Sequence, residues 1–114
     1  MSKVMLNIRE GDRIIFDMIK SGEKSIETRA GTVKFRNVAV GDTLVIKCGK
    51  DRFEKEVVDI YTFKSIEELL DTLDLKEIMP QVKSVSEAEK IWYSFSGYKE
   101  KIEKYGLVAF RLKQ

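Results

Sequence analysis

In five segments of the chain, hydrophobic residues either alternate with polar ones or form short runs between turn residues. Both patterns are typical of β-strands, in which successive side chains point to opposite faces. They predict strands at residues 3–8, 24–29, 43–48, about 53–63 and 107–112, and a further short extended piece at 32–36. Turn residues at 40–42 and 49–51 flank the third of these strands, so the third and fourth are expected to form a hairpin.

Between Asp12 and Lys20, apolar residues recur at helical spacing with charged residues opposite them, which predicts an amphipathic helix. The apolar face of this helix is expected to consist of Ile14, Ile15, Met18 and Ile19. Asp12 is a candidate N-cap, and Gly22 is a candidate C-terminal stop.

Two Ser-x-x-Glu sequences predict further helix starts, because the serine hydroxyl accepts a hydrogen bond from an exposed backbone N–H. They are Ser65 with Glu68, and Ser86 with Glu89. Helices are expected at residues 66–73, 84–93 and 98–104, with a short helical turn within 74–80. The mixture predicts one α+β domain over residues 1–114, built on a mostly antiparallel sheet. For so few short strands, curling into a small barrel is one way to remove exposed edges.

The amino-acid composition excludes several kinds of catalytic and binding site. The 114 residues are 43% hydrophobic and 35% charged, and the net charge of +2 does not indicate a strongly basic polyanion binder. The chain has no histidine, which excludes Ser-His-Asp and Cys-His catalysis and histidine-ligated zinc. Its single cysteine, Cys48, cannot form a disulfide within the chain and is expected to be a small packing residue. No metal or other cofactor is expected.

No apolar run reaches the roughly 18 residues that a membrane-spanning helix needs. Charged residues interrupt the start of the chain, so no signal peptide is expected; they are Lys3, Arg9, Asp12 and Arg13. These observations predict a cytoplasmic protein with no membrane partner.

Three charged residues lie within one short segment, at Lys24, Glu27 and Arg29. On a strand, Glu27 and Arg29 point to the same side, and Lys24 lies at the junction after Gly22, where it can turn toward them. Arginine offers planar bidentate donation to a phosphate or a base edge, and lysine offers a compact charge. If the three converge, they form a polar binding site. The alternative, which spacing alone favours, is a surface strand that its charges merely solvate.

Motif order gives a further indication. Gly22-x-Lys24-x-x-Glu27-x-Arg29 follows an amphipathic helix, Val40-Gly41-Asp42 precedes a strand, and the strand from Gly106 to Leu112 closes the chain. This order resembles the ASCH domain family, named for homology to activating signal cointegrator 1, over essentially the whole chain. The resemblance implies a fold close to the PUA domain, which is a small, mostly antiparallel β-barrel with flanking helices. It also implies a cleft that carries the first motif, and an RNA-related role.

Some bacterial members of that family are amidohydrolases that act on N4-acetylcytidine with a Lys, Thr and Glu set. The resemblance matches the lysine to Lys24, but Glu27 stands at the threonine position, with Ser25 and Thr28 out of register. For the glutamate, Glu77 is the nearest acidic candidate. In addition, Glu27 beside Lys24 is expected to hold the lysine pKa up, which opposes base action and favours binding.

Three functions therefore remain open. The first is binding of RNA or a nucleoside-like ligand through Lys24, Glu27 and Arg29. The second is hydrolysis of N4-acetylcytidine or a related modified nucleoside, with Lys24 and Glu27 as catalytic residues. The third is an adaptor that contacts a protein partner.

Four aromatic residues lie within seven positions. Trp92 and Phe95, three apart on a helix, are expected to pack in the core, whereas Tyr93 and Tyr98 are expected to line the cleft as ligand-binding residues. The mixed charges at residues 47–55 and 99–104 are expected to lie on a solvated hairpin and an exposed helix face, without a functional role.

Overall fold

A computed structural model describes residues 1–114. The strands are β1 (Lys3–Ile8), β2 (Ile26–Ala30), β3 (Thr43–Cys48), β4 (Asp51–Phe63) and β5 (Leu107–Leu112). The α-helices are α1 (Arg13–Ser21), α2 (Val33–Arg36), α3 (Ile66–Thr72), α4 (Leu75–Ile78), α5 (Val85–Ser94) and α6 (Tyr98–Tyr105). A 3-10 turn at Glu10–Asp12 precedes α1.

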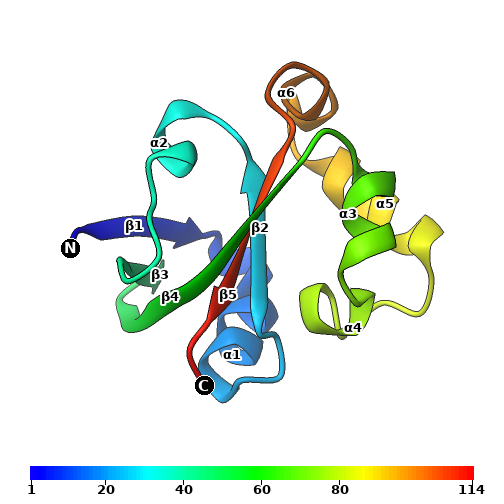
Figure 1. Ribbon diagram of the computed structural model, residues 1–114. Helices are drawn as coiled ribbons and strands as arrows, with labels where there is room; N and C mark the ends of the chain where they lie inside the picture. Colours follow the sequence, from blue (N-terminus) through cyan, green and yellow to red (C-terminus); the bar gives the residue numbers. More distant parts are fainter.

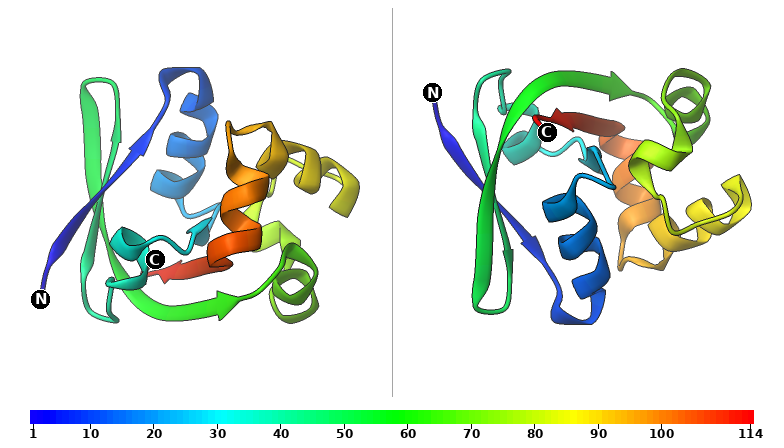
Figure 2. Two further views of the ribbon diagram at one scale, coloured as in Figure 1. Left: turned by 90° about the horizontal axis from the view of Figure 1, so that it is seen from above. Right: turned by 90° about the horizontal axis from the view of Figure 1, so that it is seen from below.

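All five strands form one sheet in the order β1-β3-β4-β5-β2 (Figure 1). The β1–β3 pair is parallel and the other three pairs are antiparallel. The long strand β4 pairs first with β3 and then with β5, and its register shifts between Val57 and Asp59. The sheet curls into a half-barrel, which leaves β1 and β2 as its two edges (Figure 2). The predicted mixed fold with a mostly antiparallel sheet is confirmed.

Two hydrophobic cores lie on opposite faces of β5. Val108 and Phe110 belong to the core that α1 covers, and Leu107 and Ala109 belong to the core under α3, α4, α5 and α6. Burial on both faces explains why the β5 sequence is a near-continuous apolar run rather than an alternating one. Figure 2 shows α1 on one side of the sheet and the four later helices grouped away from the β3–β4 hairpin.

Residues 32–36 correct the sequence prediction. The segment forms the short helix α2 instead of an extended piece, and the backbone N–H groups of Phe35 and Arg36 both donate to the carbonyl of Thr32. The Arg36 guanidinium donates to the carbonyl of Gly31, at 2.6 Å, and to that of Tyr105. The bond to Tyr105 spans 69 residues, so the pattern of neighbouring residues could not have predicted it.

Two further details differ from the pattern. Helix α5 is capped by Ser84, whose hydroxyl accepts from Glu87 N at 3.2 Å, so the capping pair lies two residues before the predicted Ser86 and Glu89. In α1, Phe16 is buried, whereas Ile14 is 61% exposed. The helix therefore faces the sheet through a stripe that is rotated from the predicted one.

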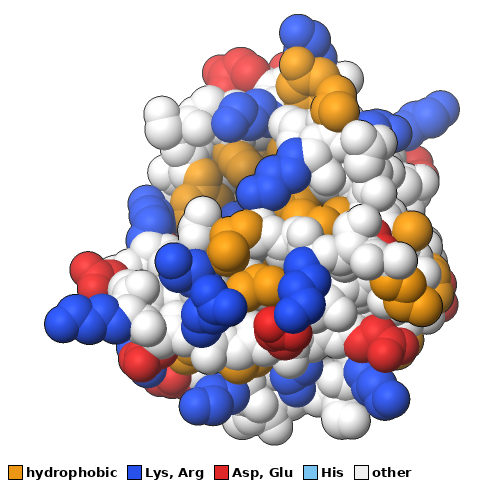
Figure 3. All heavy atoms as spheres, turned by 90° about the vertical axis from the view of Figure 1, so that its left-hand side faces the viewer, with side chains coloured by type: hydrophobic (Ala, Val, Ile, Leu, Met, Phe, Trp, Pro, Cys, Tyr) orange, Lys and Arg blue, Asp and Glu red, His pale blue; other side chains and the backbone are white.

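The β3–β4 hairpin carries a solvated set of charges. Lys3 pairs with Glu54 at 3.1 Å, and Arg13 pairs with Asp51 at 2.6 Å. Figure 3, which views the side of the molecule where β1 lies, shows basic and acidic side chains interspersed over the surface.

Cys48, at the end of β3, is buried in the core as a free thiol. None of the helices has the length and apolar composition needed to cross a bilayer.

Candidate ligand-binding cleft

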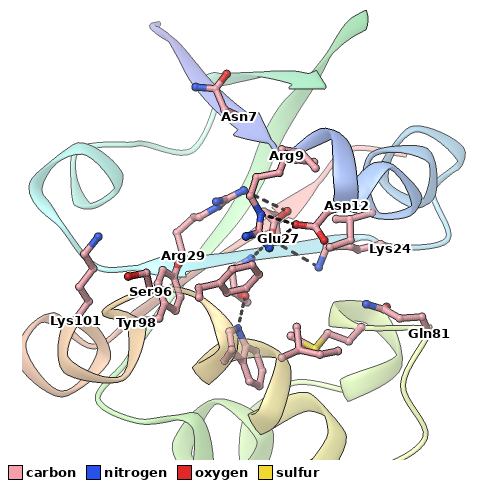
Figure 4. Close-up of a pocket in the computed structure, with 17 residues that line it drawn as sticks. Asn7, Arg9, Asp12, Lys24, Glu27, Arg29, Gln81, Ser96, Tyr98 and Lys101 are labelled. Atoms are coloured by element: carbon pink, nitrogen blue, oxygen red, sulfur yellow. Dashed lines mark hydrogen bonds and ion pairs between the residues drawn. The ribbon is translucent and has the colours of Figure 1, made fainter. Parts of the chain in front are cut away.

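A cavity of about 290 Å³ lies between the end of β1, the edge strand β2 and the helices α5 and α6. It occupies the opening of the half-barrel, where the two edge strands approach each other (Figure 4). Four basic and two acidic side chains line it, namely Arg9, Lys24, Arg29, Lys101, Asp12 and Glu27. The lining is therefore net positive, although the chain as a whole is nearly neutral.

Lys24 reaches this cavity because the chain turns sharply after α1. Gly22 adopts a left-handed conformation with φ of 90°, and Lys24 N then donates to the carbonyl of Met18 at 3.0 Å. The side chain points inward, where its ammonium donates to the carbonyl of Ile78 and lies 3.7 Å from Glu27 Oε1. Lys24 is only 4% exposed.

Glu27 and Arg29 face the same side of β2, as the alternation predicts. Their partners on β5 are Phe110 and Val108, which places both side chains toward the α1 core. Arg29 Nη2 lies 3.9 Å from Glu27 Oε2, and Glu27 Oε1 also accepts from Thr28 N at 2.8 Å. Figure 4 shows Glu27 between Lys24 and Arg29. The three charged groups thus meet around a cavity, and the alternative of a solvated surface strand is wrong.

Burial controls the protonation of Lys24. Removal from water lowers the pKa of its ammonium, and this effect outweighs the opposing attraction of Glu27. Arg29 lowers it further by repulsion. Glu27 raises this pKa, as expected, but burial lowers it by more, so the net shift is downward. Spacing along the sequence shows the neighbouring carboxylate but not the depth at which the pair lies.

Two contacts attach the helical side of the cavity to the edge of β2. The hydroxyl of Tyr98 accepts from Ala30 N at 2.9 Å, and the indole Nε1 of Trp92 donates to Thr28 Oγ1 at 3.2 Å. The first bond uses a backbone N–H that an edge strand otherwise leaves to solvent, and the second uses a buried side-chain hydroxyl. Burial raises the pKa of the Tyr98 phenol, so the phenol stays protonated across the physiological range.

The aromatic residues divide differently from the prediction. Trp92 is buried and Tyr98 lines the cavity, both as expected. Phe95, expected in the core, is half-buried and lines the cavity, where the Arg9 guanidinium lies 4.9 Å from its ring centroid. Tyr93 is 43% exposed and is not a lining residue, because it projects from the outer side of α5.

Glu77 also lies apart from the cavity lining. Its carboxylate pairs with Arg111 at 2.5 Å and accepts from the hydroxyl of Ser25 at 3.0 Å, which anchors α4 to the sheet. Glu77 therefore does not complete a catalytic set with Lys24, and Glu27 is the acidic residue next to that ammonium.

Sequence reasoning missed four charged or amide residues of the lining, which are Asn7, Arg9, Asp12 and Gln81, and gave Lys101 no role. The spacing of Arg9 and Asp12, which pair at 2.8 Å, was the one available signal. The others come from separate elements that only the curled sheet brings together.

The sequence matches no protein-family model, and no curated protein matches it. The chain is similar to solved structures, two of which follow. The crystal structure of the hypothetical protein PH0355 shares 30% identity and a TM-score of 0.83, over 99% of this chain and 98% of that one. The solution NMR structure of protein PF0455 from Pyrococcus furiosus shares 29% identity and a TM-score of 0.75, over 97% and 96% of the two chains.

Proposed function

The chain belongs to the same family as the hypothetical protein PH0355, and we propose that its cleft binds RNA or a nucleoside-like ligand. This proposal rests on one observation: the side chains of Lys24, Glu27 and Arg29 meet around one cavity, which aromatic residues also line. We further assign the fold to the ASCH type, close to the PUA domain. The motif order from Gly22 to Leu112 and the curled sheet support that assignment.

The cavity has the mixed character that a nucleoside requires. Its volume of about 290 Å³ lies near the lower end of the range for small-molecule sites, roughly 300 to 1,000 Å³. Phe95 and Tyr98 offer aromatic surface on which a base can stack. Glu27 accepts hydrogen bonds from the amino group of a base, and Arg29 donates to ring nitrogens or carbonyl oxygens.

Direct titration tests the proposal. Calorimetric titrations with the four ribonucleosides and with a single-stranded RNA oligonucleotide are expected to show saturable binding of at least one ligand. Binding of RNA is expected to weaken as salt rises, because phosphate contacts release counterions. Glu27→Gln is expected to reduce affinity, whereas the matched exposed variant Glu103→Gln on α6 is expected to leave it unchanged. If no nucleoside and no RNA binds, the proposal is wrong.

The lowered pKa of Lys24 supports a second candidate, the amidohydrolase. In this reaction the neutral Lys24 amine takes a proton from water as the water oxygen attacks the acyl carbon of N4-acetylcytidine. The bond between that carbon and N4 then breaks, the proton passes to N4, and the products are acetic acid and cytidine. Glu27, 3.7 Å from Lys24, is placed to carry the proton.

Turnover separates this candidate from simple binding. N4-acetylcytidine incubated with the protein is expected to yield cytidine, measured by chromatography, and Lys24→Met is expected to abolish the yield. The variant Lys20→Met, at an exposed position on α1, is the control. Binding of N4-acetylcytidine without cytidine formation at high protein concentration rules out the hydrolase and leaves the binding function.

A further inference from the structure

The four basic residues of the cleft differ in how fully their donors are used. Lys24 is buried and donates to Ile78. Arg9 is paired with Asp12 at 2.8 Å. Arg29 has only the 3.9 Å ion pair with Glu27 and a position 5.9 Å from the ring centroid of Phe35, and its Nε is buried with no hydrogen-bond partner. Lys101 makes no ion pair or side-chain hydrogen bond. Arg29 and Lys101 therefore hold the unsatisfied positive charge.

Arg29 and Lys101 also line a second cavity. Next to the main cavity lies a smaller one of about 200 Å³, lined by Arg29, Ala30, Thr32, Phe35, Tyr98 and Lys101. Arg29, Tyr98 and Lys101 line both cavities, so they form the wall between them. The smaller cavity has two basic residues and no acidic one. Its Thr32 hydroxyl makes no hydrogen bond in the structure and adds a free donor.

We propose that the ligand of the cleft is a nucleotide, whose phosphate lies at the wall formed by Arg29 and Lys101 while its base occupies the larger cavity. This inference rests on the proposed function. A phosphate accepts several hydrogen bonds at once, and the planar guanidinium of arginine matches its geometry. A buried donor without a partner is unfavourable, and a small movement of the Arg29 side chain, which is 25% exposed, lets Nε donate to a phosphate oxygen.

The charges also set the orientation of the nucleotide. The larger cavity contains the buried Glu27 carboxylate, which repels a phosphate and accepts from the amino group of a base. The smaller cavity is lined only by positive and neutral groups, among them the aromatic ring of Phe35. A nucleotide therefore enters with the base toward Glu27 and the phosphate toward Arg29 and Lys101. The phosphate can belong to a free mononucleotide or to an RNA strand.

Calorimetry with matched ligands tests the inference. The probes are the four ribonucleosides, their 5′- and 3′-monophosphates, inorganic phosphate and a single-stranded RNA oligonucleotide. At least one monophosphate is expected to bind about tenfold or more tightly than its nucleoside, because hydrogen bonds to a charged group are among the stronger ones. Tighter binding of RNA than of any monophosphate, with a steeper salt dependence, assigns the phosphate to a strand; the reverse assigns it to a mononucleotide.

Two variants locate the phosphate. Lys101→Gln is expected to reduce the advantage of the monophosphate and to leave nucleoside affinity largely unchanged. Arg29→Gln is expected to reduce that advantage as well, together with nucleoside affinity, because Arg29 lines both cavities. Lys104→Gln, on the same helix as Lys101 but outside both cavities, is the control. Lys101 is exposed, so its variant is expected to fold even if Arg29→Gln does not, and circular dichroism checks both.

The outcomes distinguish this inference from the proposed function. If nucleosides and monophosphates bind with equal affinity, the phosphate site is wrong while the nucleoside-binding cleft stands. If the monophosphate advantage persists in both variants, the phosphate lies elsewhere and the inference is also wrong. If none of the nucleosides, monophosphates or RNA binds, both the inference and the proposed function are overturned.

Discussion

The indole of Trp92 donates to the hydroxyl of Thr28 at 3.2 Å, and both side chains are buried. This bond joins helix α5 to the edge strand β2, 64 residues apart in the sequence. It fixes one wall of the cleft relative to the segment that carries Glu27 and Arg29. Trp92 is therefore a fixed part of the cleft lining, beside Phe95 and Tyr98.

Replacing Thr28 by valine removes the hydroxyl with little change in shape. The buried indole N–H then has no partner, and we expect the free energy of unfolding to fall by about 1–3 kcal/mol. Urea denaturation followed by tryptophan fluorescence measures it. Thr62→Val, at an exposed position on β4, is the control and is expected to change stability little. Equal effects of the two variants would show that the Trp92 bond does not stabilise the fold.

The difference in unfolding free energy between the wild type and Lys24→Met is expected to depend on pH, because Lys24 is buried. Because burial lowers the folded-state pKa of Lys24 below its usual 10.5, the unfolded chain binds more protons between these two values. The wild type therefore gains stability relative to Lys24→Met as pH rises toward 10.5. Urea denaturation of both proteins at several pH values from 6 to 10.5 measures this difference. Because the two proteins share every other titratable group, subtracting one stability from the other removes the contribution of those groups. A stability difference that is constant with pH would contradict the lowered pKa.

Asp42 is expected to contribute to acid stability. Its carboxylate accepts from Ser2 N and Ala39 N, both at 2.9 Å, and these bonds lower its pKa below 3.8. The stabilisation is present above that value and is lost as pH falls through the folded-state pKa. Asp42→Asn is therefore expected to be less stable than the wild type at pH 7, with the gap closing toward pH 2. Asp71→Asn, at an exposed position on α3, is expected to show no such gap in thermal melts.

Gly106 is expected to tolerate no side chain. It ends α6 with φ of 71° and ψ of −160°, a conformation that is essentially restricted to glycine, and an added Cβ would meet the carbonyl oxygen of Phe63. Gly106→Ala is expected to lower the free energy of unfolding by about 1–3 kcal/mol or more. Gly11→Ala is the control, since its φ is not positive and no atom lies within 4 Å of an added Cβ. Comparable urea midpoints for the two variants would refute this expectation.

Much of the fold followed from local patterns. The strands at 3–8 and 43–48 were predicted to the residue, because alternation and flanking turn residues define them without reference to distant parts. The helix after Ser65 was also predicted, because its cap is local: Ser65 Oγ accepts from Glu68 N at 3.2 Å. Local reasoning failed at α2, where Arg36 bonds to the carbonyl of Tyr105, 69 residues away.

For the cleft, the sequence alone determined that Glu27 and Arg29 share one face of a strand, because side chains on a strand alternate with a period of two. Only the tertiary structure decided how deeply Lys24 lies and which groups oppose it, since burial depends on the packing of α1 and α4 around it. It also decided that Arg9, Phe95 and Lys101 line the same cavity. The curled sheet brings its edge strands β1 and β2 close together, and the pattern of neighbouring residues does not predict this approach.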